Sequence, residues 1–344
     1  MKTWPHSFPF ASPSAPLRAR LRAWLRTSPF LWLALLIIAA VGLLPALTGS
    51  ASLREELFLM AMLVILASSV NIIMGYTGYV SFGNIVFFGL GGYLAFYLMQ
   101  TFQLHFVLAA LMAGIGASVF ALLLGTPILR LRGAYFALAT IGVNEAVRTF
   151  VANFEPFGGS VGMFFNYEMY TPYGGAKSAH WLAYYAIVFV ALVTVAVSFF
   201  VKKSKFGLGL MAIREDQDAA QVLGINPTRY KVAAYTISAF FPALAGAIFF
   251  FKNGIIEPGP AFQLHRSIEG LVMVMLGGYG TVAGPIVGAV VYERLRSFLI
   301  TNPTFSSLHL FIAGLLLLLI VLFVTAGLVG WLRQRFPVLR RYVE

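Results

Sequence analysis

Residues 204–231, SKFGLGLMAIREDQDAAQVLGINPTRYK, form a long polar excursion in a chain that otherwise consists almost wholly of apolar runs. We expect one helix over residues 207–223, with apolar side chains placed to pack into the groove of a partner, and ended by Gly224 and Pro227. The alternative is a solvated connector, but a disordered connector would not combine small apolar residues with a tight charged cluster. The residues that we assign to docking and coupling are Arg214, Glu215, Asp216, Ala220 and Gly224.

The composition is that of an integral membrane protein. Of the 344 residues, 60% are hydrophobic and 10% are charged, whereas a soluble domain carries roughly 25% charged residues. The formal net charge is +12, but the basic residues cluster at the ends of apolar runs, so membrane lipids and the positive-inside rule explain them without nucleic acid. The chain has no cysteine, and its five histidines are not paired at metal-ligand spacing, so we expect no disulfide, metal site or cofactor.

Apolar runs long enough to span, or nearly span, a bilayer recur along the chain. Nine runs and a shorter piece at 267–277, counted as a broken crossing, predict an all-α, polytopic membrane helix bundle with about ten crossings. Ten crossings put both basic ends of the chain in the cytoplasm, as the positive-inside rule requires. Arg294 and Arg296 then lie at the outer end of their helix, which conflicts mildly with that rule. The nine runs are 29–47, 57–74, 84–101, 104–126, 134–152, 181–201, 232–251, 284–300 and 308–331.

The chain divides into a membrane domain between two basic tails. Residues 1–28 are rich in Pro and Ser and predict a disordered cytoplasmic tail. We expect residues 29–331 to form the transmembrane domain, with a cytoplasmic docking and coupling loop at 202–231, and residues 332–344 to form a second cytoplasmic tail. The first apolar run is longer than that of a cleaved signal peptide, so we expect an uncleaved first helix with a cytoplasmic N-terminus.

Two glycine-rich breaks interrupt the apolar segments at membrane depth, GYTGYVSFGN at 75–84 and GGYGTVAGP at 277–285. Irregular backbone is tolerated there only when it is buried in protein or lines a wet cavity, and broken helices are typical of transporters built from repeats. The polar side chains either contact a passing solute or only satisfy backbone groups that the break frees. The candidate pathway residues around the breaks are Asn71, Gly75, Tyr76, Gly78, Ser81, Gly83, Asn84, Glu269, Gly277 and Gly278.

Three polar residues lie inside the apolar run 134–152. Glu145 and Arg148 are spaced to pair on one helix face, and a carboxylate at this depth must face protein or water. The pair is therefore either structural or, together with Asn144, part of a translocation path or gate. Glu269 also has a structural interpretation, in which Ser267 caps its helix and the helix dipole stabilises the carboxylate.

The motifs of common enzyme classes are missing. Ser81 lies in GYVSFG, which differs from the Gly-x-Ser-x-Gly nucleophile motif, and the chain has no Gly-x-x-x-x-Gly-Lys-Ser/Thr phosphate-binding loop. We expect a protein that is not an enzyme and does not itself bind ATP in that manner.

Four segments resemble the inner-membrane permeases of branched-chain amino acid ABC importers, in particular the LivM-type subunit. The resemblance covers most of the chain from about residue 57 to residue 324. The sequence AIRED at 212–216 fits the LivM type better than the sister LivH type. The segments are NIIMGYTGYVSFGNIVFFGLGGY (71–93), LRGAYFALATIG (131–142), SKFGLGLMAIREDQDAAQVLGIN (204–226) and SIEGLVMVMLGGYGTVAGPIVGA (267–289).

The resemblance implies a type II ABC-importer fold with inverted repeats, a multi-pass location in the bacterial plasma (inner) membrane and a system of several subunits. A LivH-like permease would complete a heterodimer, two cytoplasmic ABC ATPases would dock on the coupling loops, and a periplasmic or lipid-anchored substrate-binding protein would deliver the solute. The motion of the ATPases would enter the membrane through the helix that carries Arg214. The implied substrates are leucine, isoleucine, valine or other neutral amino acids.

Two hypotheses of different class remain at this point: an ATP-driven import subunit, and an ion- or proton-coupled carrier that acts alone. A carrier needs a titratable residue deep in the bundle. Glu145 is the best candidate, but its neighbour Arg148 favours a fixed pair. A carrier also has no need of a long docking loop.

Overall fold

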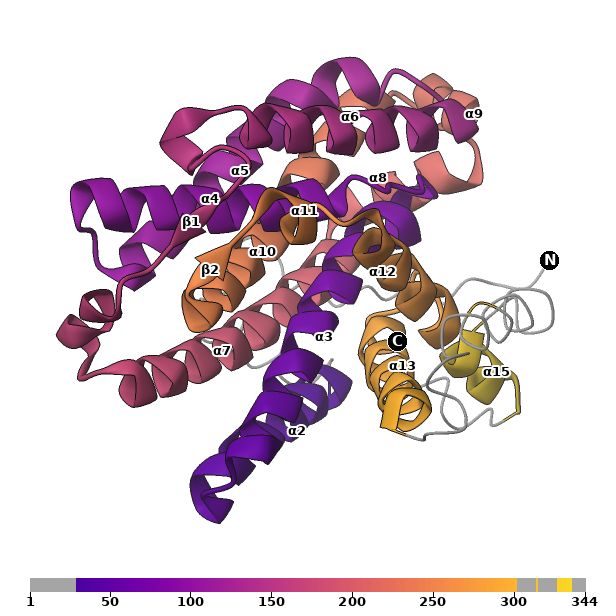
Figure 1. Ribbon diagram of the computed structural model, residues 1–344. Coiled ribbons are helices and arrows are strands. Elements are labelled where there is room, and N and C mark those ends of the chain that lie inside the picture. Colours follow the sequence, from indigo (N-terminus) through magenta and orange to yellow (C-terminus); the bar gives the residue numbers. More distant parts are fainter. Residues whose placement is uncertain (1–28, 302–313, 315–326, 336–344) are drawn as a thin grey trace, which may run out of the picture.

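The computed structural model describes residues 29–301, residue 314 and residues 327–335, and most of this part of the chain is helical (Figure 1). The α-helices are α2 (Pro29–Thr48), α3 (Ala51–Thr77), α4 (Asn84–Phe102), α5 (Phe106–Ile128), α6 (Ala134–Ala152), α7 (Ala176–Lys203), α8 (Lys205–Glu215), α9 (Gln217–Val222), α10 (Pro227–Asn253), α11 (Pro258–Ala261), α12 (Leu264–Gly277), α13 (Ala283–Thr301) and α15 (Gly327–Arg335). The remaining elements are η1 (Glu155–Phe157), η2 (Tyr167–Tyr173), β1 (Met163–Phe164) and β2 (Ile255–Ile256). The predicted tail 1–28, most of the run 308–331 and the chain after Arg335 lie outside the described residues.

Five described helices, α3, α4, α5, α7 and α10, are long and apolar enough to cross a membrane. The described part of α2 adds a shorter apolar segment, Trp32–Thr48. The helix predicted at 134–152 forms as α6, but it contains Asn144, Glu145 and Arg148 and is not among the five. The prediction of an all-α membrane helix bundle is confirmed, whereas the ten crossings and the inverted repeats stay predictions.

Helix α10 is the centre of the bundle, where it packs against α3, α4, α5 and α7. Small residues allow this packing. A Cβ atom added at Gly246 of α10 would lie 1.9 Å from the carbonyl oxygen of Phe88, and one at Gly91 of α4 would lie 2.1 Å from that of Ala243. Close backbone approach of this kind stabilises helix pairs in lipid, where the surrounding tails are as apolar as the side chains.

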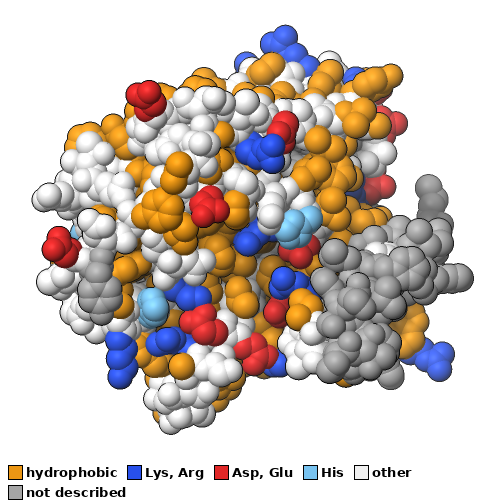
Figure 2. Space-filling view, in the orientation of Figure 1, with side chains coloured by type: hydrophobic (Ala, Val, Ile, Leu, Met, Phe, Trp, Pro, Cys, Tyr) orange, Lys and Arg blue, Asp and Glu red, His pale blue; other side chains and the backbone are white. Residues whose placement is uncertain are grey.

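The outer surface of α5 is suited to lipid. Alanines at every fourth position, Ala109, Ala113, Ala117 and Ala121, form its buried face. The opposite face consists of exposed aliphatic side chains. On the side of the molecule seen in Figure 2, by contrast, hydrophobic side chains are interspersed with acidic and basic ones. The exposed aliphatic residues of α5 include Leu108, Leu111, Ile115, Val119, Leu122 and Leu123.

The polar elements lie at two ends of the bundle. Helices α8 and α9 lie at one end, which we call the coupling end, and the strands β1 and β2 lie away from it at the far end (Figure 1). The two strands pair antiparallel and fasten the segment after α6 to the segment after α10. The Tyr170 hydroxyl strengthens this attachment by donating a hydrogen bond of 2.7 Å to the carbonyl oxygen of Phe251.

Several expected element boundaries are wrong. The single helix expected over 207–223 is divided at Asp216 into α8 and α9. Helix α12 begins before Ser267, which is therefore not its N-cap. Both breaks are shorter than the glycine-rich motifs, because α3 continues to Thr77 and α13 begins at Ala283. Helical hydrogen bonds extend into each motif from both sides, so only residues 78–83 and 278–282 are irregular.

Candidate functional site

The coupling segment, residues 204–226, is bent by a side-chain cap at its centre. Asp216 has an extended backbone, and its Oδ1 atom accepts hydrogen bonds from the N–H groups of Asp218 at 2.9 Å and Ala219 at 3.0 Å. Aspartate is a preferred N-cap residue because its carboxylate satisfies N–H groups that have no partner within the helix. Asp216 therefore starts α9 in a direction that differs from that of α8.

The two halves of the coupling segment have different surroundings. Leu210 and Ile213 of α8 are buried against the bundle, whereas Val222 and Leu223 are 88% and 79% exposed. Ala220 is buried, so its side chain supports α9 from within instead of facing a partner. Gly224 has φ +87° and follows the end of α9, as predicted. The segment thus consists of an anchored helix followed by a projecting one with an apolar tip.

Arg214 connects the coupling segment to the first break. Its Nη1 atom donates a hydrogen bond of 2.9 Å to the carbonyl oxygen of Gly75, and its Nη2 atom donates one of 2.9 Å to Glu215 Oε1. The Gly75 carbonyl belongs to the last turn of α3, where carbonyl groups have no partner farther along the helix. The Arg214 side chain is 27% exposed and that of Glu215 is 75% exposed. The arginine is therefore held by the bundle, while the glutamate remains at the surface.

The two breaks contact each other through Asn71, which is fully buried. Its Nδ2 atom donates to the carbonyl oxygen of Thr281 at 2.9 Å, and its Oδ1 atom accepts from the N–H of Gly280 at 2.9 Å. A Cβ atom at Gly75 would lie 2.7 Å from the Gly280 nitrogen, and one at Gly280 would lie 2.7 Å from Arg214 Nη1. Asn71, Gly75, Arg214, Gly280 and Thr281 thus form one packed site, which we call the junction.

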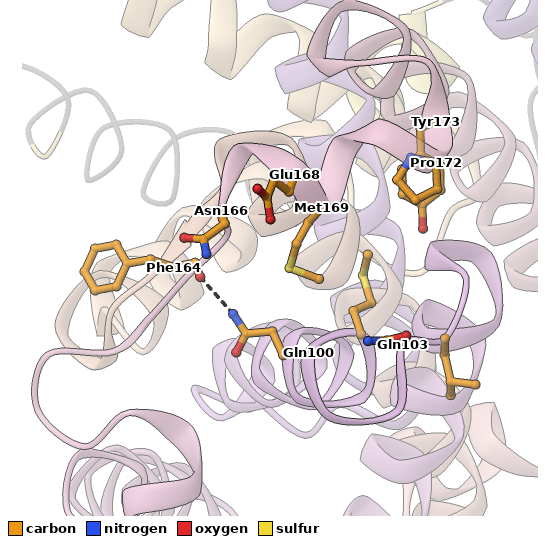
Figure 3. Close-up of a pocket in the computed structure, with 10 residues that line it drawn as sticks. Gln100, Gln103, Phe164, Asn166, Glu168, Met169, Pro172 and Tyr173 are labelled. Carbon is orange, nitrogen blue, oxygen red and sulfur yellow. Dashed lines mark hydrogen bonds between the residues drawn. The ribbon is translucent and has the colours of Figure 1, made fainter.

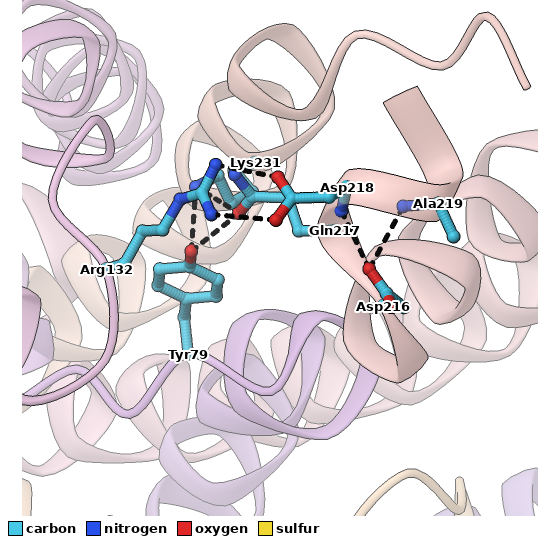
Figure 4. Close-up of polar contacts among 7 residues, drawn as sticks. All are labelled: Tyr79, Arg132, Asp216, Gln217, Asp218, Ala219 and Lys231. Atoms are coloured by element: carbon cyan, nitrogen blue, oxygen red, sulfur yellow. Dashed lines mark hydrogen bonds and ion pairs between the residues drawn. The ribbon is translucent and has the colours of Figure 1, made fainter. Parts of the chain in front are cut away.

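A second group of contacts connects the first break to α9 and α10 (Figure 4). The Tyr79 hydroxyl donates to Gln217 Oε1 at 2.7 Å and accepts from Lys231 Nζ at 3.0 Å, and Lys231 also donates to Gln217 Oε1 at 3.2 Å. Burial raises the pKa of Tyr79 above its ordinary value, so the hydroxyl stays protonated and remains a donor. We call Tyr79, Gln217 and Lys231 the tyrosine cluster.

An ion pair lies beside the tyrosine cluster at the surface (Figure 4). Arg132, in the turn between α5 and α6, donates to both carboxylate oxygens of Asp218, at 2.9 Å and 3.2 Å. The hydrogen bond to Asp218 raises the pKa of the Arg132 guanidinium above its ordinary value. The two side chains are 58% and 72% exposed, so solvent screens the pair and it contributes little stability.

The polar residues of the first break differ in whether they have partners. The Tyr76 hydroxyl lies 2.8 Å from Ser198 Oγ, and the Ser267 hydroxyl accepts the Ile85 N–H at 3.2 Å, so Ser267 serves the first turn of α4. Asn84 is buried, and neither atom of its amide has a partner among the described residues. A buried amide without a partner indicates a place for water or a ligand. The other predicted residues have backbone roles. Gly78 ends α3, and Gly277 and Gly278 end α12. Ser81 Oγ accepts a hydrogen bond of 3.2 Å from the Gly83 N–H.

The polar residues of α6 lie apart from the junction. The predicted Glu145–Arg148 pair is confirmed at 2.8 Å, and its side chains are 57% and 46% exposed. Asn144 is buried; its Nδ2 atom donates to the Phe262 carbonyl at 3.0 Å, and its Oδ1 atom has no partner within the described part of the chain. Glu269 accepts a hydrogen bond of 2.9 Å from the Tyr292 hydroxyl of α13. It lies more than two helical turns before the end of α12, and so away from the second break.

Sequence reasoning missed the residues that connect the elements at the coupling end. Gln217 has no distinctive pattern around it. Lys231, however, is a lysine directly before the long apolar part of its helix, and Arg132 directly precedes a glycine in one of the quoted motifs. Both positions are signals of a cation held at the end of a membrane helix.

Comparison with known proteins agrees with the geometry. The family described as branched-chain amino acid transport system / permease component matches residues 52–321. The high-affinity branched-chain amino acid transport system permease proteins LivM of Salmonella typhimurium and Escherichia coli are each 29% identical over 326 residues, which cover 81% of this chain and 76% of the relative. The autoinducer 2 import system permease protein LsrC of Yersinia enterocolitica is 30% identical over 139 residues, 39% of this chain and 38% of the relative. No solved structure matches the chain.

Proposed function

The chain belongs to the permease-component family of branched-chain amino acid transport systems, and from this premise we propose that it is the membrane-spanning subunit of an ATP-driven importer of branched-chain or other neutral amino acids. The family is a transport component, so ATP hydrolysis would take place in separate subunits. The observation that carries the coupling mechanism is the hydrogen bond of 2.9 Å from Arg214 to the end of α3.

The coupling segment would transmit the motion of the ATPase docked on it, one of the two in the complex. Arg214 contacts the first break at Gly75, and Gln217 contacts it at Tyr79. When the ATPases close on ATP, a displacement of α8 and α9 would move both contacts together, because the cap at Asp216 fixes the bend between the helices. Asn71 would pass the displacement to the second break and so to α12 and α13. Packed elements with two discrete arrangements convert such small shifts into alternate openings.

Charge favours a cytoplasmic coupling end. Lys202 and Lys203 directly precede the coupling segment and Lys205 lies at its start, whereas residues 153–175 at the far end contain no lysine or arginine. By the positive-inside rule, the far end would then face the periplasm and both ends of the chain the cytoplasm, in a multi-pass inner-membrane protein. Arg294, which this orientation places outside, forms an ion pair with Glu56 at the opposite end of α3 from the junction.

Helix α6 would line the translocation pathway. A charged group at the centre of a bilayer costs about 3 kcal/mol or more, so the exposed pair Glu145–Arg148 needs protein or water beside it. A LivH-like permease would supply the opposite wall. The amide oxygen of Asn144 and the amide of Asn84, which have no partners among the residues that the structure describes, are groups that a passing amino acid or its water would meet.

Reconstitution tests this function. Proteoliposomes would hold this chain with its co-encoded permease, ATPases and binding protein, and uptake of labelled leucine would be followed with and without ATP. The Arg214→Ala variant should lose about ten-fold in uptake, because a charge-assisted hydrogen bond is worth about 1.5–3 kcal/mol, while the complex still assembles. Arg229→Ala, which removes an exposed arginine at the same end, is the matched control and should keep its uptake.

A gradient-driven carrier predicts the opposite pattern. Leucine uptake by this chain alone, driven by a proton or sodium gradient and indifferent to Arg214→Ala, would overturn the proposal.

A further inference from the structure

A pocket of about 530 Å³ opens at the far end between the end of α4 and η2 (Figure 3). Its polar lining comes from both sides: Gln100 and Gln103 belong to the end of α4, and Asn166 and Glu168 belong to the segment that contains η2. All four side chains are exposed at the mouth of the pocket. The apolar part of the lining comes from methionine and leucine side chains together with Phe164, Pro172 and Tyr173.

The frame of the pocket is preformed. The Gln100 amide donates to the Phe164 carbonyl at 2.8 Å, which joins α4 to β1, and the Phe106 N–H donates to the Tyr173 hydroxyl at 2.8 Å, which joins α5 to η2. The ring of Phe165 stacks on that of Phe96 with centroids 3.8 Å apart. A ligand would therefore meet an ordered surface and would lose little affinity to ordering it.

The charge of the pocket is negative in a strongly basic protein. The chain has a formal net charge of +12, yet Glu168 is the only charged residue of the lining. Within the described part of the chain, no hydrogen bond or ion pair satisfies the Glu168 carboxylate. The side-chain oxygens of Gln103 and Asn166 are further acceptors on the same lining. Acceptors grouped around one free carboxylate suit an ammonium or a guanidinium group.

We propose that this pocket receives a lysine or arginine side chain of the substrate-binding protein. The inference rests on the proposed function, which places the far end where that protein delivers its solute. The aliphatic stem of the side chain would lie along Met99, Leu104 and Met169, and its charged head would reach Glu168. A free neutral amino acid fits less well, because its carboxylate would find no cation in the lining.

Binding of the leucine-loaded binding protein to the complete permease–ATPase complex in lipid nanodiscs tests the proposal. Glu168→Gln keeps the shape of the side chain and should weaken the Kd about ten-fold, as expected for a lost charge-assisted hydrogen bond. Glu168→Lys should weaken it further, since it places two like charges together. Glu155→Gln, which changes an exposed glutamate of the same loop outside the pocket, should bind like the wild type. An unchanged unfolding midpoint and unchanged basal ATP hydrolysis show that each variant is folded.

The outcomes separate this proposal from the one on which it rests. A Glu168→Lys complex that binds as tightly as the wild type overturns the pocket assignment and leaves the importer function standing. A wild-type complex that binds no binding protein overturns both. Labelled leucine that binds the complex without binding protein, and is lost in Glu168→Gln, replaces the side-chain ligand by the free solute. Recovery of Glu168→Lys binding by a lysine- or arginine-to-glutamate change on the binding protein would identify the inserted cation.

Discussion

The two helix breaks interrupt the backbone in the same way but are held differently. The first, between α3 and α4, contacts the coupling segment twice, through Arg214 and through Gln217. The second, between α12 and α13, is hydrogen-bonded to Asn71 of α3, and it contacts the coupling segment only through the Tyr279 ring, whose centroid lies 5.8 Å from the Arg214 guanidinium, and through the close packing of Gly280 on the same side chain. The difference is one of contact type, since the coupling segment is hydrogen-bonded to the first break and only packed against the second. Under the proposed function, we therefore expect the first break to follow the coupling segment more closely than the second does.

The largest expected effect comes from cutting the contact between the breaks. Asn71→Ala leaves the Thr281 carbonyl and the Gly280 N–H without their partners in a buried site. The free energy of unfolding should fall by about 2–4 kcal/mol, since each unsatisfied group costs about 1–3 kcal/mol, and uptake should fall with it. Thermal unfolding of the purified complex and uptake in proteoliposomes measure the two effects.

Ser68→Ala is the control for Asn71→Ala, because Ser68 is a buried polar residue of the same helix whose hydroxyl has no partner among the described residues. It should change the unfolding free energy by less than about 1 kcal/mol. If both substitutions destabilise equally, Asn71 does not specifically connect the breaks.

A smaller effect should follow from removing one hydroxyl of the tyrosine cluster. Tyr79→Phe removes the donor to Gln217 and the acceptor of Lys231. We expect the free energy of unfolding to fall by about 1–2 kcal/mol. Coupling, measured as amino acid transported per ATP hydrolysed, should be partly lost. Tyr93→Phe removes a buried hydroxyl that has no partner in the described part of the chain, so it should be neutral or slightly stabilising. Equal coupling in the two variants would exclude the tyrosine cluster from transmission.

The smallest effect is expected at the exposed ion pair. Arg132→Ala removes the partner of Asp218, but exposed pairs contribute little because solvent and salt screen them. Uptake should stay within about two-fold of the wild type, and any difference should shrink as the salt concentration rises. A loss of uptake as large as that of Arg214→Ala would mean that the force passes along the surface and not through the junction.

The membrane bundle and the positions of its breaks could be predicted because they depend on local composition. Long apolar runs, glycine-rich motifs and the spacing of Glu145 and Arg148 are all readable without tertiary contacts. The division of the coupling segment at Asp216 could not be predicted in this way. An aspartate followed by helix-forming residues is compatible with a continuous helix and also with a new N-cap, and the packing of α8 on the bundle decides between them.

The junction depends on contacts that are distant in the sequence. Asn71 and Gly280 are separated by 209 positions, and Arg214 and Gly75 by 139. Asn71, Gly75 and Arg214 were each predicted as functional, but in two separate groups. No local pattern indicates that an arginine of the coupling segment reaches the carbonyl that the end of α3 leaves free, so the connection between the groups emerges only from the fold.

The most direct test is to measure whether the coupling segment and the second break move as one body. The chain contains no cysteine, so spin labels can be placed at Lys205→Cys with Tyr279→Cys, and at Lys205→Cys with Val161→Cys, all at surface positions. Distances would be compared in the complete transporter without nucleotide and with a non-hydrolysable ATP analogue. We expect the distance from 205 to 279 to stay constant while the distance from 205 to 161 changes. A change from 205 to 279 as large as that from 205 to 161 would contradict transmission through the junction.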